Sequence, residues 1–358
     1  MMLEYLGLSL LVFHFAEPAY YYGYIKKNCC RTRNPEEDKE DPPISVIIPT
    51  YNERDNIRRK MRNVLESYPQ DKMEIIIIDS SNDGTYDIIK KEIEALNLKN
   101  IRLIKEEKRR GKIFAVREGV KLASNNIVIL TDADAFWEGS LVKAIKVLRG
   151  EVGAISCIKK ATSSLENNYR DFYNIIRLGE SSIYSTPIFH GELTAFRKDV
   201  LKPEEIPNVG ADDSTIATLI SLKGYRAICT DNVIATEIVP KGLEYFSWKT
   251  RRGSHLIRHF VRFFSKVVKS RNPKFKKIFV EEAYLHVINP WLLIFGLVLI
   301  GVSDPLLLII LLGLAVVASV ISPISKLLRA WLSNQGFLIL SQLYALRGEV
   351  IAWRKEKK

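Results

Sequence analysis

The sequence predicts an α/β fold built on a mostly parallel, Rossmann-like sheet, with membrane-associated helices at both ends of the chain. From Ile44 to about Pro240, short apolar runs alternate with amphipathic segments, a pattern typical of right-handed βαβ crossovers. Two long apolar stretches follow near the C-terminus, and an apolar, aromatic stretch stands at the N-terminus. The first observation predicts the sheet, and the other two predict the attachment to a membrane.

Five apolar runs define the expected sheet. Strands are predicted at Ser45–Pro49, Glu74–Asp79, Ile101–Ile104, Ile127–Thr131 and Gly153–Cys157. Helices are predicted between them at Glu53–Ser67, Thr85–Leu96, Gly111–Ser124 and Ser140–Leu148. Such unbroken apolar runs are typical of strands that are buried on both faces.

The N-terminal stretch, Leu3 to Tyr24, is predicted to be a membrane anchor. A cleaved signal peptide carries its positive charge before the apolar run, whereas here Lys26, Lys27, Arg31 and Arg33 follow it. Loops rich in Lys and Arg stay on the cytoplasmic side, so the end of the anchor is expected in the cytoplasm. The polar segment from Arg33 to Pro43 is then a linker.

Near the C-terminus, the stretches Val287–Val302 and Pro305–Ile321 are apolar except at Asn289 and Ser319. Each approaches the ~20 residues that span a bilayer as a helix, and Asp304 breaks them, so they predict a transmembrane hairpin. A pair of buried core helices is the alternative. The more polar segment Trp331–Trp353 predicts an interfacial or re-entrant helix, which keeps the basic C-terminus in the cytoplasm.

The formal net charge of +12 is concentrated in one region, because no acid occurs between Glu244 and Glu281. Tyr245–Val268 has a helical pattern. Its apolar face comprises Leu256, Ile257, Phe260, Val261, Phe264, Val267 and Val268, opposite Arg258, Arg262, Lys266 and Lys269. This pattern favours a helix in the membrane interface and argues against a nucleic acid as partner. The alternative is a surface helix that packs on the domain.

The strand Ile127–Thr131 ends in an acidic triplet, Asp132-Ala133-Asp134. Open α/β sheets bind ligands at the carboxyl ends of their strands. Two carboxylates there suit a hard divalent cation, Mn²⁺ or Mg²⁺, which can hold a diphosphate. A loop rich in Asp that caps the next helix is the alternative.

Three further motifs follow predicted strand ends: Pro49-Thr50-Tyr51-Asn52-Glu53, then Asp79, then Arg109-Arg110-Gly111-Lys112. The chain has neither a Walker-type loop nor a dinucleotide-type Gly-rich turn, which argues against a P-loop ATPase or an NAD enzyme. In this order the motifs resemble family 2 inverting glycosyltransferases with the GT-A fold, and the resemblance covers residues 44 to 252.

Physical chemistry gives these residues roles with which the resemblance agrees. Asp79 can accept a hydrogen bond from a nucleobase, and Tyr51 offers a stacking face. Lys112 can neutralise a diphosphate, and Asp132 with Asp134 would hold the cation. The nucleotide-sugar site is predicted to comprise Pro49, Thr50, Tyr51, Glu53, Asp79, Lys112, Asp132, Ala133, Asp134 and Arg251. Family members often have two acids after the second strand, whereas here Ser80 or Ile78 replaces one, which leaves the choice of nucleotide open. A UDP-sugar is the favoured donor, and a GDP-sugar is possible.

Asp212-Asp213 precedes the helical run Ser214–Leu222, where an Asp can simply be the N-cap. The resemblance implies that Asp213, paired with Asp212, is the base that deprotonates the acceptor hydroxyl. It also implies an acceptor site at Gly191 and Glu192, although a simple turn before the strand Leu193–Phe196 fits as well.

Trp248-Lys249-Thr250-Arg251-Arg252 is similar to the Gln-x-x-Arg-Trp motif of the hyaluronan, cellulose and chitin synthases. Arg251 matches the Arg of the motif and can bind a diphosphate through two hydrogen bonds. Trp248 replaces the Gln, and Arg252 replaces the Trp. The resemblance therefore extends to membrane-integrated synthases, but not to every residue of their motif.

Together these features predict a metal-dependent glycosyltransferase in the cell membrane, with its catalytic domain in the cytoplasm, that extends a growing glycan in polysaccharide biosynthesis. The alternative is transfer of a single sugar to polyprenyl (dolichyl) phosphate or to a lipid-linked oligosaccharide. A catalytically silent scaffold is disfavoured by the acids, and oligomers are compatible with the sequence. The expected divisions are 1–25 anchor, 26–43 linker, 44–240 GT-A domain, 241–280 interface helix, 281–322 hairpin and 323–358 interfacial helix.

Overall fold

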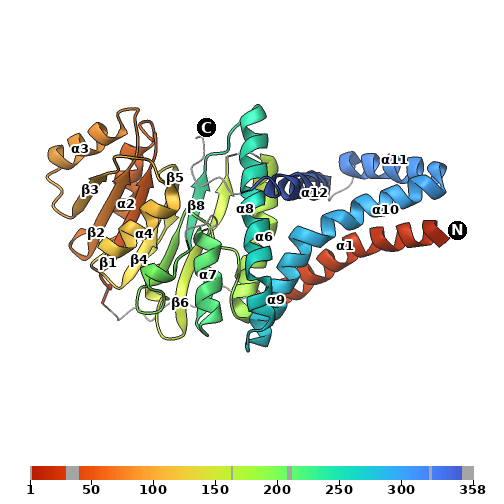
Figure 1. Cartoon of the computed structure of the whole chain (residues 1–358), viewed down its shortest axis with the longest axis horizontal. Coiled ribbons are helices and arrows are strands. Elements are labelled where there is room, and N and C mark those ends of the chain that lie inside the picture. The colour runs from red at the N-terminus through yellow and green to blue at the C-terminus, as the bar shows by residue number, and fades with distance from the viewer. Residues whose placement is uncertain (1, 30–39, 163, 208–211, 322–324, 349–358) are drawn as a thin grey trace.

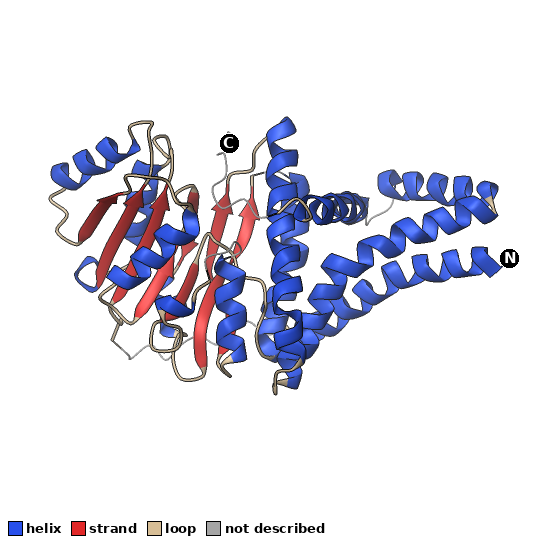
Figure 2. Ribbon diagram, in the orientation of Figure 1, coloured by secondary structure: helices blue, strands red, loops and turns tan. Residues whose placement is uncertain are grey.

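The computed structural model has a sheet domain at one end and a group of long helices at the other (Figure 1). It describes residues 2–29, 40–162, 164–207, 212–321 and 325–348. Most of the predicted linker therefore lies outside the described residues, as does the segment after residue 348. The strands are confined to the sheet domain, and the N-terminus lies at the far tip of the helical end (Figure 2).

Within the described residues, one eight-stranded sheet has the order β3-β2-β1-β4-β7-β6-β8-β5. Its strands are β1 (Ile44–Thr50), β2 (Met73–Asp79), β3 (Ile101–Lys105), β4 (Ile127–Leu130), β5 (Ala135–Gly139), β6 (Val152–Ala161), β7 (Thr194–Arg197) and β8 (Arg226–Glu237). β1 pairs in parallel with β2 and β4, and β2 with β3, as predicted. β7 is antiparallel to β4 and β6, and β5 to β8, so the whole sheet is mixed.

All five predicted strands form, but the sequence analysis did not predict β5 and β8. β5 begins directly after the acidic triplet, and its last two residues, Glu138 and Gly139, are exposed. In β8 the polar pair Asp231-Asn232 breaks the apolar sequence pattern, although the strand itself is continuous. These two strands pair with each other, and this long-range pairing, rather than local sequence, makes them strands.

Helices cover both faces of the sheet. They are α2 (Ile57–Ser67), α3 (Thr85–Ala95) and α5 (Leu141–Lys146) on one face, and α4 (Lys112–Leu122) and α7 (Asp212–Leu222) on the other, with short 3₁₀ turns at Gln70–Lys72 and Pro203–Glu205. Val46 and Ile48 of β1 face the first layer, and Ile47 faces the second. This burial on both sides explains why the strand is apolar at successive positions.

Two long helices, α6 (Ser164–Ile183) and α8 (Gly242–Val268), stand between the sheet and the remaining helices (Figure 1). α6 was not among the predicted helices. The prediction of a single apolar face on α8 is wrong in part, because Phe260, Phe263 and Val267 are buried, in a core cluster with residues of α9 (Pro273–Ala283). The neighbouring stripe of Val261, Phe264 and Val268 is exposed. One stripe of the helix therefore packs on the domain, and the neighbouring stripe faces outwards.

A buried histidine on α8 makes the stability of this region depend on pH. Burial, together with nearby Arg262, lowers the pKa of His259 to about 3, whereas an unfolded histidine titrates near 6.5. Between these values the unfolded state binds more protons, so stability falls as the pH falls. From pH 6.5 to pH 5 we expect the parent to lose about 2 kcal/mol more than His259→Gln, which can keep the contact with Thr218. Chemical denaturation of the detergent-solubilised proteins at both pH values checks this, and equal losses would contradict it.

The remaining helices form the other end of the molecule. They are α1 (Met2–Asn28), α10 (Asn289–Ser303), α11 (Pro305–Ile321) and α12 (Ser325–Ala345), and a π-helical turn at Tyr284–Ile288 joins α9 to α10. α1 packs closely on α10, since a Cβ on Gly7 would lie 2.9 Å from the carbonyl oxygen of Gly296. The Trp331 indole N–H of α12 donates to His14 of α1 over 3.1 Å. These contacts join segments that are far apart in the sequence.

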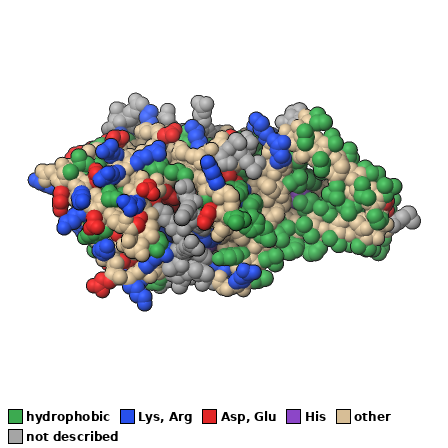
Figure 3. Space-filling model, turned by 90° about the horizontal axis from the view of Figure 1, so that it is seen from above, with side chains coloured by type: hydrophobic (Ala, Val, Ile, Leu, Met, Phe, Trp, Pro, Cys, Tyr) green, Lys and Arg blue, Asp and Glu red, His purple; other side chains and the backbone are tan. Residues whose placement is uncertain are grey.

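Hydrophobic side chains cover much of this helical end, whereas charged side chains gather over the sheet domain (Figure 3). Among the described residues, one helical stretch, Pro273–Ser303, is both long and apolar enough to cross a membrane. Pro305–Ile321 is apolar but shorter, and α1 does not meet the same criterion. The N-terminal anchor and the two-helix hairpin therefore stay predictions.

Candidate functional site

A cavity of about 460 Å³ lies between the carboxyl ends of the central strands and the helices α6, α8 and α12. Most of the predicted site residues line it: Pro49, Thr50, Tyr51, Glu53, Lys112, Asp132, Ala133, Asp134, Gly191, Asp213 and Arg251. The side chain of Asp212 lies outside the described part of the chain. Asp79 and Glu192 are absent from the wall of the cavity, and both prove to be buried in other contacts.

The acidic triplet connects β4 to β5 and faces the cavity. The Lys112 ammonium lies 2.7 Å from Oδ1 of Asp132. A Cβ on Gly191 would come within 3.0 Å of Asp132 Oδ2 and 3.1 Å of Lys112 Nζ, so a larger residue there would crowd this pair. Burial raises the pKa of Asp132, and the negative charges of Asp134 and Glu192 add to this effect, while Lys112 opposes it. Two acids are thus held close together where a cation lowers their repulsion.

These residues fit a divalent cation that is shared with a substrate. The described residues contain no group of three or more His, Cys, Asp or Glu side chains that could hold a metal by themselves. Mg²⁺-type sites in nucleotide-dependent enzymes, however, need only one or two carboxylates, because phosphate oxygens complete the ligand set. The Asp132 carboxylate already contacts the Lys112 ammonium, so a divalent cation from the cavity would share or replace this contact.

The position of Asp79 differs from the prediction. Its carboxylate is fully buried and accepts hydrogen bonds from Thr50 Oγ1 (2.7 Å), Ser81 Oγ (2.5 Å) and the Ser81 backbone N–H (3.2 Å). Asp79 therefore ties the end of β1 to the end of β2, and its neighbour Ser80 lines the cavity instead. A sequence shows that an acid ends a strand, but not which way its side chain turns.

The ring of Tyr51, predicted to be a stacking face, has a cation on it. The guanidinium of Arg109 lies 3.5 Å from the centroid of the Tyr51 ring, and both residues line the cavity. A planar guanidinium on an aromatic face adds a favourable cation–π contact. This pair brings a positive charge from the loop after β3 to the wall of the cavity.

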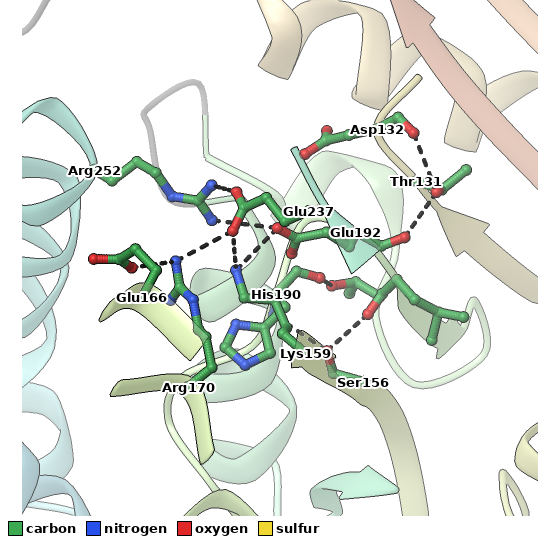
Figure 4. A network of polar contacts seen from close by, with 12 residues as sticks. Thr131, Asp132, Ser156, Lys159, Glu166, Arg170, His190, Glu192, Glu237 and Arg252 are labelled. Carbon is green, nitrogen blue, oxygen red and sulfur yellow. Dashed lines mark hydrogen bonds and ion pairs between the residues drawn. The ribbon is translucent and has the colours of Figure 1, made fainter. Parts of the chain in front are cut away.

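Glu192 also differs from its predicted place in an acceptor site. Figure 4 shows its carboxylate inside a network of ion pairs. Lys159 Nζ lies 2.9 Å from Glu192 and 3.2 Å from Glu237, and Arg252 contacts both carboxylates. Burial by itself would raise the pKa of Glu192, but Lys159 and Arg252 outweigh burial and lower it. Glu192 is thus an ionised internal residue that holds the wall of the cavity.

The network continues onto α6, where Arg170 contacts Glu237 at 3.2 Å and Glu166 at 3.4 Å. Glu166 also accepts hydrogen bonds from Tyr245 and Lys249 of α8. The sequence analysis missed Lys159, Glu166, Arg170 and Glu237 as site residues. They lie within a strand or on a helix, and no local motif marks them.

Arg252, which stands in place of the Trp of the Gln-x-x-Arg-Trp motif, was given no role from the sequence. Its guanidinium lies 5.0 Å from the centroid of the Trp248 ring. Burial would lower its pKa, but the carboxylates of Glu237, Glu192, Asp132 and Asp213 together raise it. Arg252 is therefore a permanent positive charge near both predicted acid sites, beside Arg251 in the cavity wall.

The far end of the cavity is cationic and aromatic. Its wall includes Arg170, Arg177, Lys249, Arg258, Tyr169, Tyr173 and, from α12, Phe337 and Leu338. Arg177 is fixed by two hydrogen bonds to Glu282, of 2.7 and 3.2 Å. Because α12 and the turn after α9 belong to the helical end, the cavity reaches from the acidic triplet to the apolar part of the molecule.

Comparison with known proteins agrees with this geometry. The model of glycosyl transferase family 2 matches residues 45–203. A solved structure of the mannosyltransferase PcManGT from Pyrobaculum calidifontis, in complex with GDP-Man and Mn²⁺, is 37% identical, with a TM-score of 0.84 over 96% of this chain and 99% of that one. The likeness therefore extends beyond the sheet domain to nearly the full length of both chains.

Two curated relatives are similar over shorter segments. A dolichyl N-acetyl-α-D-glucosaminyl phosphate 3-β-D-2,3-diacetamido-2,3-dideoxy-β-D-glucuronosyltransferase of Methanococcus voltae is 37% identical over 102 residues, 28% of this chain and 32% of the relative. A poly-β-1,6-N-acetyl-D-glucosamine synthase of Staphylococcus aureus is 26% identical over 261 residues, 66% of this chain and 60% of the relative. The chain thus matches about a third of the first relative and under two thirds of the second.

The sheet with its acid-lined cavity, the family match and the full-length likeness to a solved mannosyltransferase agree with one another. The chain belongs to glycosyltransferase family 2.

Proposed function

We propose that this protein is a membrane-bound, cation-dependent, inverting glycosyltransferase that transfers a single sugar from a nucleoside diphosphate sugar to a lipid-linked acceptor. One observation supports this most directly: a single cavity joins the acidic triplet to a cationic wall beside the apolar helices. A water-soluble donor can bind at the first end, and an anionic group on a lipid can bind at the second. This favours the alternative acceptor of the sequence analysis over a growing polymer.

The donor end is formed by residues that suit a diphosphate. Asp132 and Asp134 would bind Mn²⁺ or Mg²⁺, which when present neutralises charge on the departing diphosphate. Lys112, Arg109 and Arg251 add positive charge around the same space. GDP-mannose is the first donor to test, since the mannosyltransferase that is 37% identical binds GDP-Man, and UDP-sugars are the second.

Asp213 is proposed as the base. It begins α7 together with Asp212 and lines the same cavity as Asp132 and Asp134. In a one-step displacement, a carboxylate takes the proton of the acceptor hydroxyl as that oxygen attacks the anomeric carbon. The hydroxyl then bonds to the sugar as the diphosphate leaves from the opposite face, which inverts the configuration.

The acceptor is proposed to bind along α6, α8 and α12. A phosphate would bind Arg170, Lys249 and Arg177 in competition with the carboxylates that now contact them, Glu166 and Glu282 among them. Tyr169 and Phe337 offer faces for a sugar or an isoprenoid. The name of the Methanococcus voltae relative contains dolichyl N-acetyl-α-D-glucosaminyl phosphate, a lipid-linked sugar, which is consistent with such a ligand. Under this proposal Pro273–Ser303 crosses the cell membrane, and the sheet domain faces the cytoplasm.

A polymer synthase is the second candidate, because the match to the poly-β-1,6-N-acetyl-D-glucosamine synthase covers 66% of this chain. The two candidates differ in product. Membranes containing the protein are incubated with radiolabelled GDP-mannose or UDP-sugars and extracted with organic solvent. Label in the lipid phase is the expected result. Label in a large water-soluble polymer would favour the synthase, and no enzyme-dependent label from any donor would contradict both.

Asp134→Ala tests the cation-dependent donor site. Residues that only orient a metal ligand contribute 10- to 100-fold to metal affinity, so we expect the loss of a direct carboxylate ligand to lower donor affinity in Mn²⁺ about 100-fold. In EDTA, where both proteins lack the cation, their donor affinities should agree within about twofold. Calorimetric titration of the purified proteins measures both. Asp71→Ala, an exposed acid on the 3₁₀ turn before β2, is the matched control. Equal Mn²⁺-dependent donor binding by Asp134→Ala and parent would contradict the assignment.

A further inference from the structure

Lys60 of α2 is fully buried and connects the two residues that flank the acidic triplet. Its ammonium donates to Thr131 Oγ1 and to the carbonyl oxygen of Ala135, each over 2.7 Å. It also lies 4.1 Å from the centroid of the Trp137 ring. The side chain thus contacts the chain immediately before Asp132 and immediately after Asp134.

The same hydrogen bonds extend to the loop that contains Gly191. The Thr131 hydroxyl donates to the Glu192 carbonyl oxygen over 2.7 Å, and the Trp137 indole N–H donates to the same oxygen over 2.8 Å. The backbone N–H of Asp132 donates to the carbonyl oxygen of Gly191 over 3.2 Å. One buried ammonium is therefore linked to both loops that meet at the donor end of the cavity.

An ammonium in this place is costly. Burial of a cation without a directly paired carboxylate is unfavourable, and burial lowers the pKa of Lys60 to about 7 against the attraction of Asp132 and Asp134. An apolar side chain of similar length would avoid that cost. The two flanking hydrogen bonds are what such a side chain could not supply.

We propose that Lys60 is a positioning residue for the cation site: by holding Thr131 and Ala135 together, it fixes the separation of the Asp132 and Asp134 carboxylates. This inference rests on the proposed function, because it assumes that these two acids bind a divalent cation. Lys60 does not line the cavity, so it acts through the turn and not by contact with substrate.

Positioning and simple charge predict opposite results when Lys60 is removed. If Lys60 acted only as a nearby positive charge, it would repel the divalent cation, and its loss would tighten cation binding. If it orders the two carboxylates, its loss loosens the turn and weakens binding. Partners that orient metal ligands typically contribute 10- to 100-fold in metal affinity, so we expect the second effect to dominate.

The test uses Lys60→Met in the full-length protein, with Mn²⁺ as the probe in the presence of GDP and, in a parallel series, UDP, because phosphate oxygens complete the ligand set of the cation. A protein-free series at the same nucleotide concentration is the reference. Electron paramagnetic resonance of free Mn²⁺ gives the dissociation constant, which we expect to rise about tenfold. Asn63→Ala is the matched control. Asn63 lies one turn further along α2 and exchanges two hydrogen bonds with the Trp137 backbone, of 2.8 and 2.9 Å. It joins the same helix to the same strand without touching the flanks of the triplet.

Thermal unfolding without Mn²⁺ verifies that both variants fold, and only Lys60→Met should bind Mn²⁺ more weakly. If Lys60→Met does not fold, Thr131→Val removes one of the two flanking contacts and should weaken Mn²⁺ binding in the same direction. Unchanged or tighter Mn²⁺ binding would overturn the inference, as would an equal loss in Asn63→Ala. A parent protein that binds no Mn²⁺ with either nucleotide would contradict the proposed cation site itself, which separates the two failures.

Discussion

Asp213→Asn is expected to lower the kcat of sugar transfer about 10³-fold, within the 10²- to 10⁴-fold range that general-base catalysis contributes. The amide keeps the shape of the side chain and an oxygen that can accept the hydrogen bond from the Ser214 backbone N–H, now 2.7 Å. It cannot take a proton from the acceptor hydroxyl at neutral pH. Donor binding should stay within about twofold of the parent, because the diphosphate is held elsewhere in the cavity.

Initial rates with saturating donor, together with calorimetric donor titration, separate these effects. Asp71→Asn is the matched control and should transfer sugar at the parent rate. Asp212→Asn tests the other member of the acidic pair and shows which of the two is the base. If both Asp212→Asn and Asp213→Asn transferred sugar as fast as the parent, the proposed mechanism would be wrong.

Lys159→Met is expected to destabilise the protein by about 3 kcal/mol. Breaking a buried ion pair by removing one partner typically costs 3–5 kcal/mol, because the other charge stays buried. Here both Glu192 and Glu237 would lose a contact, of 2.9 and 3.2 Å, and the guanidinium groups of Arg252 and Arg170 compensate only in part. The loss appears as a lower midpoint in chemical denaturation.

The neighbouring Lys160→Met provides the comparison for this variant. Lys160 lies on the same strand but is exposed, so its replacement should change stability by less than about 0.5 kcal/mol. The double variant Lys159→Met with Glu192→Gln removes one charge of each sign and should recover part of the loss. A Lys159→Met protein as stable as Lys160→Met would show that the network does not support the domain.

Much of the donor end could be predicted from the sequence, because the end of a strand is recognised from residues that are neighbours in the chain. A run such as Ile127–Leu130 is apolar because both faces of β4 are buried, and the polar residues that follow it must lie at the edge of the sheet. The acidic triplet and Lys112 were found in this way, whereas Asp213 was found through the family resemblance, and all of them line one cavity. The direction of a side chain at such an edge is not local, and for that reason Asp79 was misplaced.

The acceptor end of the cavity was harder to predict from the sequence. Lys159 lies within β6, Glu237 ends β8 and Arg170 lies on α6, and their sequence gives no sign that they meet. On α8, periodicity alone also did not distinguish the stripe of Phe260 and Phe263, which packs on α9, from the stripe of Val261 and Phe264, which is exposed. Both stripes are apolar, and only the presence of a neighbouring helix decides which of them is buried.

The sequence by itself determined the α/β order of the domain, the acids at its strand ends and the apolar character of the terminal helices, because each of these depends on residues close together in the chain. The tertiary structure alone decided the antiparallel half of the sheet, the buried ion pairs around Lys159, and the place of Lys60 under the acidic triplet. Strand pairing and buried charge are stabilised by partners that lie tens of residues away, and folding, not the local pattern, brings these partners together.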